Sequence, residues 1–94
     1  MRKLVRGPDG HERSVERERE INLAVAAAFS GDAGRIVLDY LKSITTNVAS
    51  GPEISDRALM HLEGQRFLVG LLSQRINLGH KEKTRNVDDQ GTKA

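Results

Sequence analysis

The sequence predicts an all-α protein with three helices and polar, extended termini. Two observations lead to this prediction: apolar residues recur at helical spacing in separate segments, and turn-forming residues divide those segments. We expect the helices at residues 11–29, 32–45 and 55–78, with the last two forming an antiparallel hairpin. A chain of 94 residues has room for one domain with a small core.

The composition excludes several classes of protein. The 15 basic and 13 acidic residues give a net charge of +2, too weak a bias to indicate nucleic-acid binding. Without cysteine there are no disulfides and no thiolate metal sites. The longest apolar run, "LAVAAAF" at 23–29, is far shorter than the roughly 20 residues that span a bilayer. We therefore expect no membrane-spanning segment and synthesis in the cytoplasm.

The expected domain organisation is an arm at 1–10, a helical domain at 11–79 and a tail at 80–94. The arm ends in the turn-forming residues "GPDG", and the tail is polar and without helical periodicity. We expect the tail to become ordered only when it binds a partner. The aliphatic residues of these segments are the expected docking anchors: Leu4, Val5 and Val87.

The first expected helix changes character halfway along. Its start, "ERSVEREREI", is nearly all charge, and opposite charges three residues apart meet on the helix surface. Such a face is usually solvated, and docking on another subunit is the alternative. The second half, "INLAVAAAF", is small and apolar, so another helix can approach it closely.

Capping residues bound the other two expected helices. Ser30 or Asp32 can cap the helix at 32–45, and Ser55 or Asp56 the helix at 55–78. Gly79 lies where glycine commonly ends a helix. Both helices carry an apolar stripe at helical spacing. Its members are Ala33, Ile36, Val37, Tyr40, Leu41 and Ile44 in the first helix, and Met60, Gly64, Phe67, Leu68, Leu71 and Leu78 in the second.

Residues that would carry catalysis or bind a metal do not form a recognised motif. His11, His61 and His80 lie far apart and lack a ligand spacing, and no nucleophile stands beside a base. We therefore expect no cofactor, no metal and no enzymatic activity. A helix-turn-helix DNA reader would need polar side chains on its second helix, and "DAGRIVLDYLKS" offers few long ones.

Two short motifs carry a family resemblance. The stretch "AFSGDAGRIVLDYL" is followed, after a loop, by "EGQRFLVGLL". This pattern resembles a small family of tailed-bacteriophage proteins that carry an aromatic residue before Gly-Arg-x-Val-Leu, then Glu-Gly-x-Arg on the next helix. The matching positions are Phe29, Gly34, Arg35, Val37, Leu38, Glu63, Gly64 and Arg66. They lie between Ala28 and about Leu72, which is about half of the chain.

The resemblance implies a non-enzymatic structural or accessory component of the virion. Genes of such proteins tend to lie among those for the portal and other virion parts. The implied location is the head–tail vertex, against the portal or an adaptor, in a homo-oligomeric ring or symmetric array. Release with the DNA stays open. The alternative is a small DNA-binding packaging or regulatory protein.

The same motifs suggest a structural hypothesis for the expected hairpin. Gly34 and Gly64 would be positions of close helix packing, and Glu63 would face Arg35 across the contact. On the alternative interpretation Glu63 and Arg66 face solvent, and Gly64 is simply tolerated.

Overall fold

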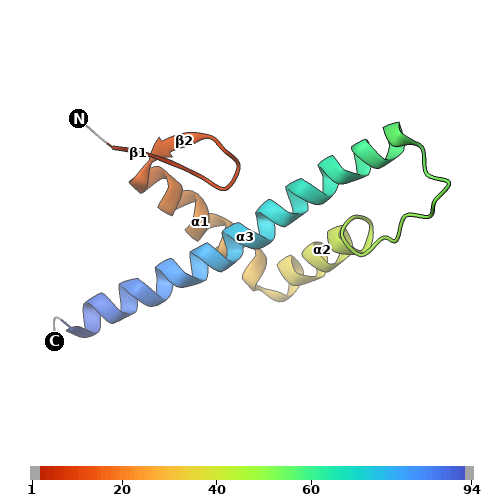
Figure 1. The fold of residues 1–94 in the computed structure, drawn as a ribbon. Helices are drawn as coiled ribbons and strands as arrows, with labels where there is room; N and C mark the ends of the chain where they lie inside the picture. The colour runs from red at the N-terminus through yellow and green to blue at the C-terminus, as the bar shows by residue number, and fades with distance from the viewer. Residues whose placement is uncertain (1–2, 93–94) are drawn as a thin grey trace.

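The computed structural model describes residues 3–92, and the side chains of residues 3–84. Figure 1 shows that three helices dominate the fold, as predicted, and that a small two-stranded sheet precedes them. The protein is therefore mainly helical and not strictly all-α. Its elements are β1 (Leu4–Arg6), β2 (Glu12–Ser14), α1 (Val15–Ser30), α2 (Asp32–Ser43) and α3 (Asp56–Thr92).

The N-terminal segment is a β-hairpin where the sequence predicted an extended arm. β1 and β2 are antiparallel, with Leu4 opposite Ser14 and Arg6 opposite Glu12. The predicted turn closes them: the Gly7 N–H donates to the His11 carbonyl at 2.9 Å, and Gly10 has φ +86°, which glycine adopts readily.

This pairing delays the start of the first helix. Residues 12–14, which were expected to be helical, are held in β2, so α1 begins at Val15. The Ser14 Oγ then caps the helix by accepting from the Arg17 N–H at 3.1 Å.

A tight turn joins α1 to α2, and the two helices are bent by 96°. Gly31 is the N-cap of α2, and no side chain caps that end, so neither Ser30 nor Asp32 takes the predicted role. Gly34 lies so close to α1 that an added Cβ would be 2.4 Å from the Ala28 carbonyl oxygen. Glycine at 34 therefore permits the sharp turn.

The third helix is much longer than predicted. The Ser55 Oγ accepts from the Ala58 N–H at its start, as expected for a cap, but the helix continues past Gly79 to Thr92. Most of the predicted tail at 80–94 is thus helical. Gly79 does not end the helix because it is a packing contact: an added Cβ would lie 2.2 Å from the Asn22 carbonyl oxygen and 2.4 Å from the Ala26 Cβ.

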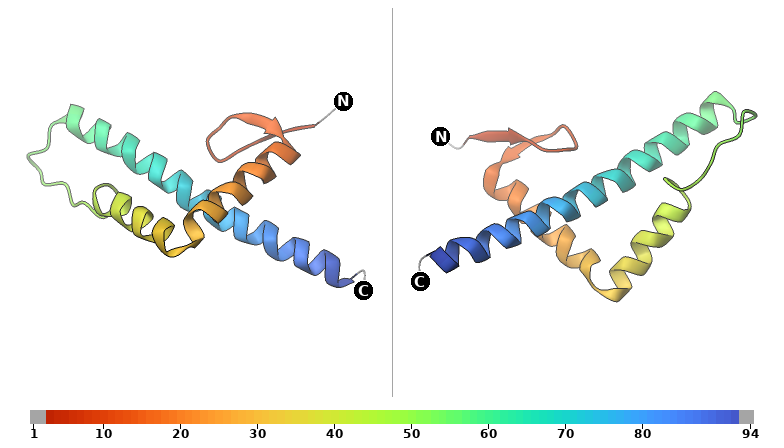
Figure 2. Two further views of the ribbon diagram at one scale, coloured as in Figure 1. Left: turned by 180° about the vertical axis from the view of Figure 1, so that it is seen from behind. Right: turned by 60° about the horizontal axis from the view of Figure 1, so that its bottom comes forward.

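The main packing in the molecule is the crossing of α1 over the middle of α3 (Figures 1 and 2). α2 runs back along the N-terminal half of α3 in the opposite direction, but it touches α3 only thinly. The last two helices are therefore antiparallel, as predicted, but the contact between them does not form the core.

The apolar core at this crossing is small. Among the described side chains, the buried hydrophobic residues are Ala26 and Val69. The radius of gyration is 16.8 Å, against about 12 Å for a compact domain of this length. Much of the helix surface among residues 3–84 is consequently exposed to solvent.

No single helix within residues 3–92 combines the length and apolar character needed to cross a membrane. α1 and α2 meet that criterion only when they are taken together as a bent pair.

Substituting Gly79 by alanine should destabilise the protein, because the new Cβ would overlap the backbone of α1. We expect the free energy of unfolding to fall by about 1–3 kcal/mol in urea denaturation. Gly70 is the matched control, since it lies in the same helix and nothing is within 4 Å of an added Cβ. Gly70→Ala should raise stability by roughly 0.5–1 kcal/mol. Equal effects of the two substitutions would contradict the packing role of Gly79.

Candidate functional site

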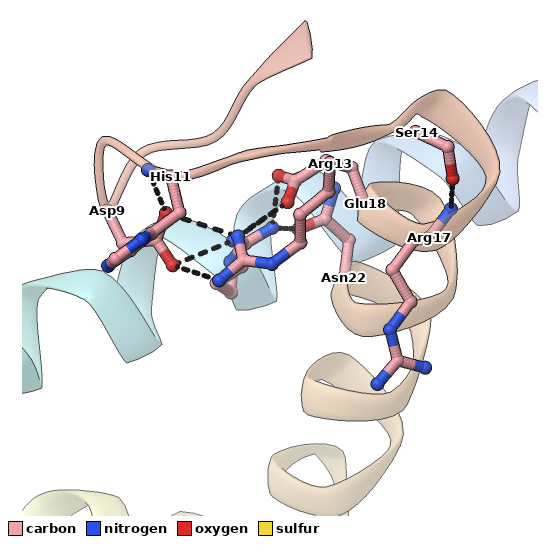
Figure 3. A network of polar contacts seen from close by, with 8 residues as sticks. Asp9, His11, Arg13, Ser14, Arg17, Glu18 and Asn22 are labelled. Carbon is pink, nitrogen blue, oxygen red and sulfur yellow. Dashed lines mark hydrogen bonds and ion pairs between the residues drawn. The ribbon is translucent and has the colours of Figure 1, made fainter. Parts of the chain in front are cut away.

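A cluster of charged and polar side chains lies where the β-hairpin meets α1 and α3 (Figure 3). We call it the ion cluster, and its members are Asp9, Arg13, Glu18, Asn22 and Arg75. Three of them are nearly inaccessible: Arg75 is 5% exposed, Asn22 7% and Glu18 8%. Charged residues this deeply buried need partners, because an unpaired charge in the interior is strongly destabilising.

Arg75 is the centre of the ion cluster and its contribution from α3. Its Nη1 donates to the Glu18 Oε1 at 2.7 Å and to the Asn22 Oδ1 at 2.8 Å, both on α1. Glu18 and Asn22 are four residues apart, so they lie one turn apart on one face of the helix. One guanidinium therefore fixes α1 against α3 at a defined register.

The β-hairpin contributes the remaining two members of the ion cluster, Arg13 and Asp9. Arg13 donates from Nη1 to the Glu18 Oε2 at 2.8 Å and from Nη2 to the Asp9 Oδ2 at 2.9 Å. Asp9 also lies 3.6 Å from the Arg75 Nη2. Gly7 sits directly on the Glu18 carboxylate, since an added Cβ would be 2.5 Å from Oε1. The hairpin is therefore held to both helices through charge.

The contacts of the ion cluster shift the pKa values of Glu18, Asp9 and Arg13 in the direction that favours their charged forms. The hydrogen bond from Arg75, supported by Arg13, holds the pKa of Glu18 below its ordinary value even though burial acts in the opposite direction. Hydrogen bonds from Arg13 and from the His11 backbone likewise lower the pKa of Asp9. The same carboxylates raise the pKa of Arg13. Two guanidinium groups thus balance two carboxylates.

A second polar contact holds the loop between α2 and α3. Arg66 on α3 donates from Nε to the Thr45 carbonyl at 3.0 Å, and from Nη2 to the Val48 carbonyl. Its Nη1 donates to the Glu63 Oε1 at 2.6 Å. A cation suits this place because carbonyl groups past the end of α2 carry partial negative charge. Glu63 and Arg66 thus form a local pair within the motif that the sequence singled out.

The hypothesis for Arg35, Glu63 and Gly64 does not match this geometry. Among the described side chains no ion pair joins Arg35 to Glu63, which pairs with Arg66 in its own helix. Gly64 is exposed, with nothing within 4 Å of an added Cβ. The close approach to α3 occurs instead at Gly79, and Gly34 lies close to α1. The error arose because the sequence does not show which helix crosses α3.

The expected docking anchors lie in different settings. Leu4 in β1 is exposed and Val5 is half-buried in the same strand. Val87 belongs to α3, but its side chain lies outside the described residues. Of the three histidines, His61 lies beside Gln65 on α3. The part of the chain with described side chains holds no group of three acidic or histidine residues placed to bind a metal ion.

Sequence reasoning missed the ion cluster. It treated the charged start of the first helix as a solvated face, although Glu18 in that segment is buried. One signal was present: Arg75 interrupts the apolar run "FLVGLLSQRINLG", and an arginine on an otherwise apolar helix face often marks a buried ion pair. Its partner could not be read, because it lies 57 residues away along the chain.

The fold and the ion cluster define a small, elongated helical protein whose elements are joined by buried charge. A model of the Bbp19-like phage protein family matches residues 25–83, which is more than half of the chain. The chain therefore belongs to the Bbp19-like phage proteins. The match includes the last six residues of α1, all of α2 and α3 as far as Lys83. Comparison with curated proteins gave no match, and comparison with solved structures gave none either.

Removing the guanidinium of Arg75 should destabilise the fold, because Glu18 would lose its main partner in the interior. For Arg75→Met we expect a loss of about 3 kcal/mol in the free energy of unfolding, measured in urea. The double variant Glu18→Gln/Arg75→Met should lose less than the sum of the two single variants. Arg17→Met is the control, since Arg17 pairs with Glu20 on the surface and should cost less than about 1 kcal/mol. Strict additivity would contradict the coupling.

The stability of the protein should decline in acid because of Glu18. Its pKa is lowered on folding from an ordinary value of 4.5, so its contribution is complete above that pH and is lost as the pH falls through the lowered value. Urea unfolding from pH 7 down to pH 3 should show a decrease that begins near the ordinary pKa. The decrease should be smaller in Arg75→Met and unchanged in Arg17→Met. The same acid dependence in all three proteins would contradict this assignment.

Proposed function

We propose that this Bbp19-like protein is a non-enzymatic structural or accessory component of a tailed-phage particle. Its place would be the head–tail vertex, against the portal or an adaptor, in a symmetric array of copies. Family membership supports the phage context. The vertex location follows the resemblance described above for the two short motifs.

The observation that carries this proposal is the apolar surface that α2 and α3 leave uncovered. Large hydrophobic side chains on these two helices and at the C-cap of α2, Ile44, are exposed: Ile36, Val37, Tyr40, Ile44, Met60, Phe67 and Leu68. Such a concentration of exposed apolar surface in a small protein marks a protein interaction site. Leu4 adds an exposed apolar side chain on the hairpin. A subunit of a larger assembly requires such surfaces.

A DNA-binding packaging or regulatory role is the alternative. The 96° bend between α1 and α2 falls within the range of helix-turn-helix pairs. Besides Arg35 and Asp39, however, α2 exposes the large apolar side chains Ile36, Val37 and Tyr40, whereas a DNA reader needs polar side chains that reach phosphates and base edges. The geometry therefore favours protein contact.

Quantitative mass spectrometry of purified phage particles, before and after induced DNA release, tests the proposal. A fixed number of copies that stays in emptied particles is the result expected of a connector component, and loss on release would identify a protein ejected with the DNA. Absence from both samples would overturn the virion role. Salt-sensitive DNA binding by the purified protein would then support the alternative, because phosphate contacts release counterions.

A further inference from the structure

Two apolar stripes on the described part of this chain are largely exposed to solvent. We define the α2 stripe as Ile36, Val37 and Tyr40 of α2 with Ile44 at its C-cap, and the α3 stripe as Met60, Gly64, Phe67 and Leu68. No residue of α2 is buried, although its polar and apolar residues are clearly segregated around the helix. The large side chains of both stripes are between 48% and 75% exposed. Segregation of this kind is typical of a helix that packs against something.

The α3 stripe continues the face of α3 that α1 covers. Gly64 and Gly79 are 15 residues apart, a little over four helical turns, so they point to roughly the same side. At Gly79 the backbone of α1 fills the space that a side chain would occupy, whereas nothing lies near Gly64. The molecule thus packs one helix across a glycine in the second half of this face. The equivalent position in the first half is uncovered.

The two stripes suit one another in length and shape. Each spans nine residues, which corresponds to about 12 Å at the rise of an α-helix, with Ile44 at the C-cap of α2. The α2 stripe offers large side chains, with Tyr40 and Ile36 projecting most. The α3 stripe has a gap at Gly64, which lies between Met60 and Phe67 and has no side chain, and nothing is within 4 Å of an added Cβ. Large side chains of one helix that enter a gap in another are the usual basis of helix packing.

The exposed area is also close to what a specific contact requires. From their exposed fractions, the seven large side chains of the two stripes present on the order of 900 Å² together, and a biological interface needs about 1,000 Å² in total. Flanking residues such as Leu71 supply the remainder.

We propose that the α2 stripe of one copy of this chain packs against the α3 stripe of a second copy. Because donor and acceptor are different surfaces, each copy can engage two neighbours, and the contact extends to a ring or an array. This proposal rests on the proposed function only in assuming that the contact forms within a phage particle. The purified chain alone tests it, so its failure would leave the virion assignment standing.

The test measures self-association of the full chain by sedimentation equilibrium at concentrations up to about 0.5 mM, which detects weak contacts. We expect oligomers of the unmodified protein. Tyr40→Glu and Gly64→Glu should each weaken association at least tenfold, because each puts a charge into the contact. Both positions are exposed in the single chain, so helix content measured by circular dichroism should be retained.

Two control variants separate this contact from a general effect of added charge. Gly70 is exposed on α3, six residues after Gly64 and about a third of a turn away around the helix, so Gly70→Glu should leave association unchanged. Val15 is an exposed apolar residue outside both stripes, and Val15→Glu should behave likewise.

A mixing experiment identifies which stripes meet. Tyr40→Glu retains an intact α3 stripe and Gly64→Glu retains an intact α2 stripe, so a mixture of the two should form a heterodimer that does not grow further. If like stripes paired instead, mixing would restore nothing, and the proposal would be wrong. The proposal would also be wrong if the unmodified protein stayed monomeric at all concentrations, or if the variants associated as strongly as the unmodified protein. This holds even if the stripes bind a different phage protein.

Discussion

The architecture depends on the crossing of α1 over α3, where Arg75 and Gly79 lie one turn apart. Gly79 brings the two backbones together, and Arg75 fixes their register through Glu18 and Asn22. Neither residue suffices alone. The glycine permits a close approach at many angles, and a buried guanidinium is tolerated only where its partners are in place.

The ion cluster also explains how so small an apolar core supports the fold. The hairpin has little apolar surface to bury, yet Arg13 and Asp9 connect it to Glu18 and through it to α3. A further ion pair joins α1 to α3 beyond the crossing, where the Arg19 Nε lies 2.9 Å from the Glu82 Oε2, about one turn past Gly79. Directional charged contacts thus replace much of the non-directional burial that a larger domain would use.

The small apolar core leaves helix surface exposed, and this bears on function. Because α1 covers only part of α3 and α2 contributes little burial, apolar residues of α2 and α3 stay exposed. Arg66 holds the loop after α2 without covering them. An elongated chain with uncovered stripes is well suited to a role as a subunit, in which neighbours complete the packing. The phage family assignment is consistent with such a role.

The sequence by itself determined the predominance of helix, the second helix, Ser55 as one of two candidate caps, and a phage protein family. The structural features among these are local, because periodicity and capping act within a few residues. It misjudged the arm, the end of the third helix and the partners of Glu63 and Gly64. Only the tertiary structure decided these, because β1 pairs with β2 across a loop, and Gly79 and Arg75 meet α1 more than 50 residues away. A glycine that ends a helix and one that lets a helix pass are identical in sequence, and the approach of α1 distinguishes them.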